Sequence, residues 1–232
     1  MSLMSNSYVL QLRRVARAAG VPRLLSRFAK DYESSFSRQL MQACRPGDIV
    51  WDVGANVGHY SVQFSDWVGA SGKVFAFEPD VVNLPELRSA CSARANIEIR
   101  EFGLSDKSEQ MNFVGDDSDR TVSRVLLPGE PVPAGATKVQ LRTGDSVIQG
   151  GDAKCPNVIK IDVEGHELSV LTGLQQSLLD PRLRSIFVEV HFTILDRSGR
   201  AEDPKKIEAM LKRSGFKVSW TDASHIFASK PA

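Results

Sequence analysis

The chain has 232 residues, of which 42% are hydrophobic and 25% charged, and its formal net charge is +1. This length fits one large domain with an extension, and the composition is that of an ordinary globular protein. A charge so close to zero provides no overall field that attracts nucleic acid or a membrane surface, and no apolar run reaches the ~20 residues that span a bilayer.

The cysteines are few and widely separated, at Cys44, Cys91 and Cys155. Their odd number and their spacing argue against a disulfide framework or a zinc cluster, and they suit a reducing compartment. Since no apolar signal-peptide core stands near the start either, we expect a cytoplasmic protein.

The first 45 residues are predicted to form a helical extension ahead of one domain at 46–232. Residues 8–30 carry six basic residues and no acid, and apolar residues recur there at helical spacing. The favoured interpretation is an amphipathic extension that packs on the core. A contact with an anionic substrate or with a lipid surface, and a contact within a homodimer, are the alternatives.

From residue 46 onward, strand patterns alternate with helix patterns. Five short apolar stretches are predicted as strands, at 48–54, 73–79, 97–103, 157–165 and 184–191. Four of them are followed by helical patterns, at 59–68, 81–93, 166–179 and 204–215. This alternation predicts an α/β, Rossmann-like, doubly wound fold with a mostly parallel sheet and helices on both faces.

The end of the chain refines this prediction. Residues 216–220 and 225–230 both look like strands, and only four residues separate them. A parallel crossover needs a dozen residues or more, so these strands must pair antiparallel. A seven-stranded, mostly parallel sheet with an antiparallel strand near the C-terminus is typical of class I methyltransferases rather than of all-parallel dinucleotide-binding sheets.

A long segment separates the third strand from the fourth. Residues 109–115 and 138–144 look like additional strands, and the stretch between them is polar and rich in glycine and proline. Loops of this length are mobile or functional. We expect a mobile loop at 115–137, acting as a lid over the site or extending as a surface excursion.

The first strand ends in the sequence WDVGANVGHY, where Asp52 precedes a turn built on Gly54, Asn56 and Gly58. Glycines let the backbone approach a ligand closely, and the helix that follows favours a carboxylate or phosphate at its N-terminus. The carboxylate of Asp52 would repel a pyrophosphate and attract an ammonium group. A ligand with an amino-acid moiety, such as S-adenosylmethionine, satisfies both preferences.

In an open parallel sheet, ligands bind beyond the carboxyl ends of the strands. Glu78 closes the second strand, where an acid can accept hydrogen bonds from both ribose hydroxyls. The third strand closes with Gly103, Leu104 and Ser105, next to Asp106, where an adenine ring would lie. These strand ends together favour S-adenosylmethionine as the cofactor.

Charged residues also close the fourth and fifth strands. Lys160, Asp162 and Glu164 alternate, and so do Glu189 and His191. Charges on central strands are unfavourable unless they are paired or functional. We expect Lys160 to pair with Glu189, and Asp162, Glu164 and His191 to surround the site; a buried ion network is the alternative.

Several motifs resemble FkbM-type methyltransferases in order and spacing: WDVGANVGHYS, AFEP, GLSD, KIDVEGHELSVLTG and EVH. The resemblance covers residues 48 to about 195, and KIDVEGHE is its most diagnostic part. It implies S-adenosylmethionine as the methyl donor and an oxygen acceptor on a sugar, glycolipid or secondary metabolite. The donor-binding residues expected from the strand ends and the resemblance are Asp52, Gly54, Ala55, Asn56, Gly58, Tyr60, Glu78, Pro79, Gly103, Leu104, Ser105 and Asp162.

The expected reaction is O-methylation, in which the acceptor hydroxyl must lose its proton during attack. His191 is the first candidate for the general base because a histidine pKa lies near neutrality, and Asp162 and Glu164 are the alternatives. No metal is required by any spacing. Metal-assisted transfer through Asp162, Glu164, Glu189 and His191, a cofactor-binding module without turnover, and a nicotinamide-dependent reductase are the competing hypotheses.

Overall fold

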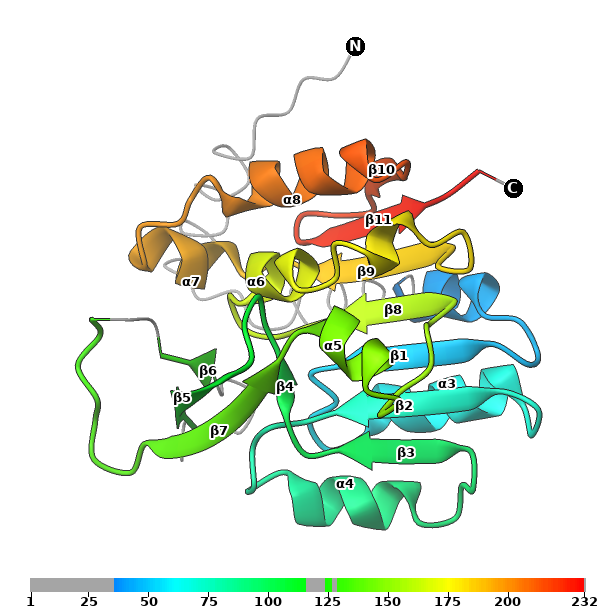
Figure 1. Ribbon diagram of the computed structural model, residues 1–232, viewed down its shortest axis with the longest axis horizontal. Coiled ribbons are helices and arrows are strands. Elements are labelled where there is room, and N and C mark those ends of the chain that lie inside the picture. Colours follow the sequence, from blue (N-terminus) through cyan, green and yellow to red (C-terminus); the bar gives the residue numbers. More distant parts are fainter. Residues whose placement is uncertain (1–35, 116–123, 127–128, 232) are drawn as a thin grey trace, which may run out of the picture.

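The structure is a computed structural model that describes residues 36–115, 124–126 and 129–231 (Figure 1). The basic segment at 8–30, and with it most of the expected N-terminal extension, lies outside the described residues. Residues 36–43 are helical. The loop expected at 115–137 also lies partly outside the described residues.

The main sheet has seven strands in the order β10-β11-β9-β8-β1-β2-β3. Only β11 runs antiparallel to its neighbours β9 and β10, which confirms the predicted mostly parallel sheet. The strands are β1 (Ile49–Val53), β2 (Lys73–Phe77), β3 (Ile97–Arg100), β8 (Val158–Ile161), β9 (Ser185–Glu189), β10 (Lys217–Trp220) and β11 (His225–Ser229).

Helices cover both faces of this sheet because alternate strand residues are apolar on both sides. In β1, Val50 packs with Phe64 on one face, whereas Trp51 and Val53 pack with Leu171 on the other. The helices are α3 (His59–Val68), α4 (Leu84–Cys91), α5 (Gly144–Gln149), α6 (Glu167–Thr172), α7 (Phe192–Arg197) and α8 (Asp203–Arg213). Their burial of apolar side chains on two faces is the physical basis of the doubly wound fold.

The helix predicted over 166–179 is shorter than expected. It ends as α6 at Gly173, and a separate 3-10 turn, η1 (Ser177–Leu179), follows. A Cβ added at Gly173 would stand 1.9 Å from the carbonyl oxygen of Ser105. The glycine thus allows the end of α6 to approach the chain that closes the third predicted strand.

That third strand is also divided. β3 ends at Arg100, and β4 (Gly103–Leu104) belongs to a second sheet of order β4-β7-β5-β6. The other strands of this sheet are β5 (Glu109–Val114), β6 (Arg124–Val125) and β7 (Thr137–Arg142). Figure 1 places this second sheet on the side to which the arrowheads of β2, β3 and β8 point, beyond the carboxyl ends of the central strands.

Candidate active site

A pocket lies at the carboxyl ends of β1, β2 and β8, and the second sheet forms its outer wall through Phe113, Val125 and Leu141. The space between its lining atoms is ≈ 670 Å³, open solvent included. Eight residues predicted for the site line it: Gly54, Asn56, Glu78, Pro79, Gly103, Leu104, Asp162 and Glu164. Asp52, Ala55, Gly58, Tyr60, Ser105 and His191 do not line it.

The glycine turn after β1 forms one wall of the pocket. Gly54 has φ +79°, and a Cβ there would lie 1.8 Å from the carbonyl oxygen of Asp162. Asn56 also adopts a left-handed conformation, with φ 49°. Gly58, with φ 92°, begins α3. The turn therefore packs directly on the loop after β8, which only a glycine at position 54 permits.

Glu78 connects the turn to the second strand end. Its Oε2 accepts a hydrogen bond from the backbone N–H of Asn56 at 2.7 Å, and its Oε1 accepts one from Asp80 at 2.8 Å. Burial raises the pKa of Glu78 to about 7, although these hydrogen bonds oppose the shift. The carboxyl group is therefore held in place at the pocket wall, and each of its oxygens retains acceptor capacity.

Asp52 is fully buried rather than exposed to the pocket. Its Oδ2 accepts a hydrogen bond from Ser61 at 2.6 Å, and its Oδ1 lies 3.2 Å from Lys160 Nζ. Asp52 therefore does not line the pocket, and its contact with an ammonium group stays a prediction. Asp162, whose side chain is 28% exposed and lines the pocket, is the acid available at this position.

The expected bridge between Lys160 and Glu189 is also absent. Lys160 lies opposite Asp52 in the parallel register of β8 with β1, and its Nζ is 3.4 Å from Asp162. Glu189 lies opposite His225 of β11 instead, with 3.3 Å between their side chains. β8 lies between β9 and β1, but its register sets Lys160 opposite Asp52 on β1 and opposite Phe187 on β9, two residues short of Glu189.

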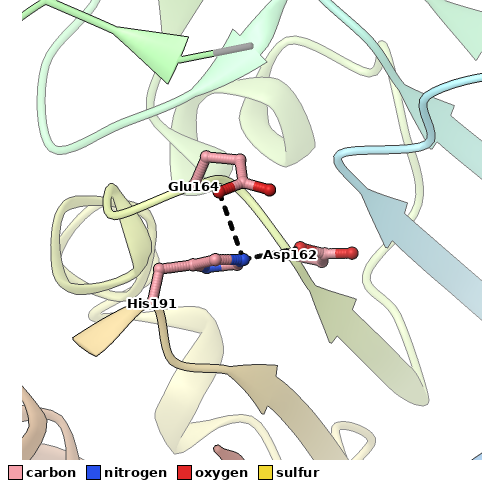
Figure 2. Close-up of side chains that lie close together, drawn as sticks. All are labelled: Asp162, Glu164 and His191. Carbon is pink, nitrogen blue, oxygen red and sulfur yellow. Dashed lines mark ion pairs between the residues drawn. The ribbon is translucent and has the colours of Figure 1, made fainter. Parts of the chain in front are cut away.

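His191, Asp162 and Glu164 come together, as predicted, although the strand alternation ends at Ile161. Figure 2 shows the imidazole of His191, after β9, facing both carboxylates from the chain after β8. Its Nε2 lies 3.3 Å from Glu164 and 3.6 Å from Asp162. Glu164 reaches this place through a left-handed backbone, with φ 49°.

A third carboxylate, Glu167, holds the other side of the ring. Its Oε1 lies 2.7 Å from His191 Nδ1 and also accepts the N–H of Gly165, while the side chain is fully buried. Sequence reasoning missed Glu167, although it belongs to the KIDVEGHE string. Because it begins α6, its direction toward β9 depends on the turn at Gly165, where φ is +89°.

The charge on His191 differs from the expectation. Burial by itself lowers the pKa of an imidazole, but the carboxylates of Glu164 and Glu167 outweigh it and raise the pKa of His191 to about 11. With no ligand bound, this pKa favours the protonated ring at neutral pH, and the role of general base for His191 stays a prediction.

Of the residues that close the third predicted strand, Gly103 and Leu104 line the pocket and Ser105 does not. Ser105 is fully buried, and its Oγ contacts Asp106 Oδ1 at 3.0 Å and His166 Nε2 at 2.8 Å. His166 lines the pocket, and burial lowers its pKa, so the ring is neutral. The position of His166 directly after the fourth predicted strand could have identified it as a pocket residue from the sequence.

The fold and the position of the pocket define the class I methyltransferase architecture, and solved structures share it. One is a precorrin-6y C5,15-methyltransferase from Geobacter metallireducens (TM-score 0.50, 14% identity, 84% of this chain and 87% of that chain). Another is a SAM-dependent O-methyltransferase from Thermotoga maritima (TM-score 0.51, 15% identity, 87% of this chain and 65% of that chain).

The chain belongs to the FkbM methyltransferase family, since the Methyltransferase FkbM domain matches residues 52–218. It is 28% identical to the hexuronic acid methyltransferase AglP of Haloferax volcanii, over 82% of this chain and 72% of that protein. It is also 28% identical to the 31-O-demethyl-FK506 methyltransferase FkbM of Streptomyces tacrolimicus, over 75% of this chain and 74% of that protein.

Membership of this family identifies the protein as a methyltransferase that uses S-adenosylmethionine. Within the residues that the structure describes, no helix is long and apolar enough to cross a membrane.

Proposed function

We propose that the protein transfers the methyl group of S-adenosylmethionine to a hydroxyl group on a sugar, a glycolipid or a secondary metabolite. The observation that supports this most directly is the cluster of Asp162, Glu164 and His191, which adjoins the pocket at the carboxyl ends of β8 and β9. An acceptor hydroxyl must be oriented and must lose a proton, and such a cluster provides groups for both tasks. The names of the two relatives, with hexuronic acid and 31-O-demethyl-FK506 as substrates, agree with an oxygen acceptor.

In this proposal the pocket wall holds the donor, which supplies a methyl group on a positively charged sulfur. Glu78 accepts hydrogen bonds from the ribose hydroxyls. Asp162 takes the ammonium group in place of the buried Asp52. The Gly54 turn lies along the amino-acid part, and Leu104 covers the adenine ring.

Transfer is an in-line displacement, so the protein contributes mainly alignment and exclusion of water. Glu164 is the proposed proton acceptor, because burial raises its pKa and makes the carboxylate more basic than usual. The O–H bond of the acceptor breaks as oxygen bonds to the methyl carbon, and the electrons of the C–S bond return to sulfur. His191, held by Glu167, orients Glu164 and balances its charge.

The proposal is tested with isotope-labelled S-adenosylmethionine and a panel of hexuronic acids, glycosides and hydroxylated macrolides. The intact protein should label at least one hydroxyl, and Glu164→Gln should lower kcat about 10²- to 10⁴-fold with little change in donor affinity. The exposed Glu202 provides a matched control, because Glu202→Gln should leave both quantities unchanged. Tight donor binding without transfer to any acceptor would favour a cofactor-binding module instead.

A further inference from the structure

One ligand atom from each of Asp162, Glu164 and His191 lies within 4.8 Å of the other two. The side chains are partly exposed, at 28%, 18% and 16%, so the space between them is open to an entering ion. Carboxylate oxygens and an imidazole nitrogen together suit divalent cations such as Mn²⁺ and Mg²⁺.

Two of the three separations within the cluster, both from His191 Nε2, are closer to those of ligands around a cation than to those of hydrogen-bonded partners. The contacts of His191 Nε2 with Glu164 and Asp162 are 3.3 and 3.6 Å, whereas charged N–H···O⁻ hydrogen bonds are about 2.7–2.9 Å. Ligand atoms about 2.0–2.2 Å from one metal stand about 3.0–3.5 Å apart. Nδ1 of the same ring, at 2.7 Å from Glu167, shows the true hydrogen-bond distance.

Glu167 is the second and independent observation. A histidine that binds a metal almost always donates its other N–H to a carboxylate, which aims the free nitrogen at the ion. Glu167 makes this contact while fully buried, and its other oxygen, Oε2, has no hydrogen-bond partner. A buried carboxylate with an unsatisfied oxygen is stabilised by positive charge close by.

The charges around the cluster also favour a bound cation. Three carboxylates surround one imidazole ring, and the nearest lysine, Lys160, is shared between Asp162 and the buried Asp52. Lys160 therefore cannot balance the acids on the His191 side by itself. A divalent cation between the three side chains would take the place of the proton on His191 Nε2 and add positive charge among the acids.

We propose that Asp162, Glu164 and His191 bind a divalent cation of the Mn²⁺ or Mg²⁺ type, with Glu167 positioning the histidine. The proposal rests on the proposed function for its role, which is to hold the acceptor hydroxyl beside the donor methyl group. Three protein ligands leave open coordination positions, so acceptors with a second oxygen next to the methylated hydroxyl are favoured. Glu164 binds the ion through one oxygen, and the other oxygen remains available to take the hydroxyl proton.

The test is a titration of metal-stripped full-length protein with Mn²⁺ alone, in which the electron paramagnetic resonance signal of free Mn²⁺ reports binding. One site is expected, with affinity at least tenfold weaker in Glu164→Gln and in His191→Gln. Glu167→Gln, which removes a positioning residue, should weaken binding about 10- to 100-fold. Glu202→Gln should bind as the intact protein does.

Thermal unfolding of each variant distinguishes loss of the metal site from loss of the fold. If Glu167→Gln does not fold, Glu164→Gln, at a partly exposed position, still tests the metal site. No Mn²⁺ binding up to millimolar concentration, or equal binding by intact protein and both ligand variants, would overturn the metal site. Two further assays test the proposed function separately from the metal site. They are calorimetric titration with S-adenosylhomocysteine and transfer of the labelled methyl group in the presence of EDTA. If methyl transfer persists in EDTA and no Mn²⁺ binds, the proposed cation site is refuted and the proposed methyltransferase function is retained.

Discussion

Replacement of Lys160 by methionine is expected to destabilise the fold more than a typical substitution. Lys160 is 3% exposed, and its Nζ lies 3.2 Å from Asp52, 3.4 Å from Asp162 and 3.2 Å from the carbonyl oxygen of Gly54. Burial alone would lower its pKa, but Asp52 and Asp162 outweigh burial and raise the pKa, so the lysine is charged. Methionine preserves most of the stem and removes only the charge and its hydrogen bond.

The magnitude follows from the Asp52 pair. At 3.2 Å and an effective dielectric constant of about 20, the attraction is about 5 kcal/mol. In Lys160→Met the Asp52 carboxylate stays fully buried with only Ser61 as partner. Removal of one partner from a buried pair typically costs about 3–5 kcal/mol, and we expect a loss in this range.

Urea unfolding measures this loss as a shift of the midpoint at unchanged slope, roughly 1.5–2.5 M for a slope of about 2 kcal/mol/M. Adding Asp52→Asn to Lys160→Met should recover at least half of the stability, because the unpaired charge is then gone. Lys205→Met, at an exposed pair with Glu202, is the control and should cost under about 1 kcal/mol. A loss below about 1 kcal/mol in Lys160→Met, or no recovery in the double variant, would refute the reasoning.

Three further predictions concern the pocket and the sheet edge. Burial raises the pKa of Glu78 to about 7, and in the proposed function only the ionised form accepts hydrogen bonds from both ribose hydroxyls. Adenosine affinity should therefore fall up to about tenfold per pH unit below that value. Calorimetry on Glu78→Gln should give an affinity that does not change over this pH range. Gly54→Ala should lower the free energy of unfolding by at least about 2 kcal/mol and weaken donor binding, since its Cβ meets the Asp162 carbonyl. Gly215→Ala, which follows α8 and has open space around it, should cost only about 1 kcal/mol, and equal losses would contradict the role of close packing. His225 is buried between two carboxylates, which outweigh burial and raise its pKa to about 9. It therefore stabilises the fold fully below its unfolded pKa near 6.5, and up to about 3 kcal/mol of stability should be lost as pH rises through 9. Urea unfolding of His225→Gln should not show this loss.

Much of the pocket followed from the sequence because the relevant information is local. Strand and helix periodicities are read within a dozen residues, and the ends of parallel strands gather at one edge of a sheet whatever their order. Gly54, Asn56, Glu78, Leu104 and Asp162 were predicted in this way and line the pocket. The antiparallel strand near the C-terminus followed from loop length alone, because four residues exclude a parallel crossover.

The second sheet was not predicted as a separate body. β4 and β7 pair across more than 30 residues of chain, and β4 has only two residues, which is too short for a periodic signal. The sequence pattern therefore assigned Gly103 to the end of a main-sheet strand. Its actual place beside Leu141 is what brings the second sheet over the pocket.

The sequence by itself determined which residues stand at the strand ends and, through the KIDVEGHE motif, the family to which they belong. Only the tertiary structure decided which of them meet. The register of β8 with β1 paired Lys160 with Asp52 and buried both, and the start of α6 placed Glu167 against His191. Charge, burial and proton affinity depend on neighbours that lie far apart in the chain, and a linear pattern does not contain those distances.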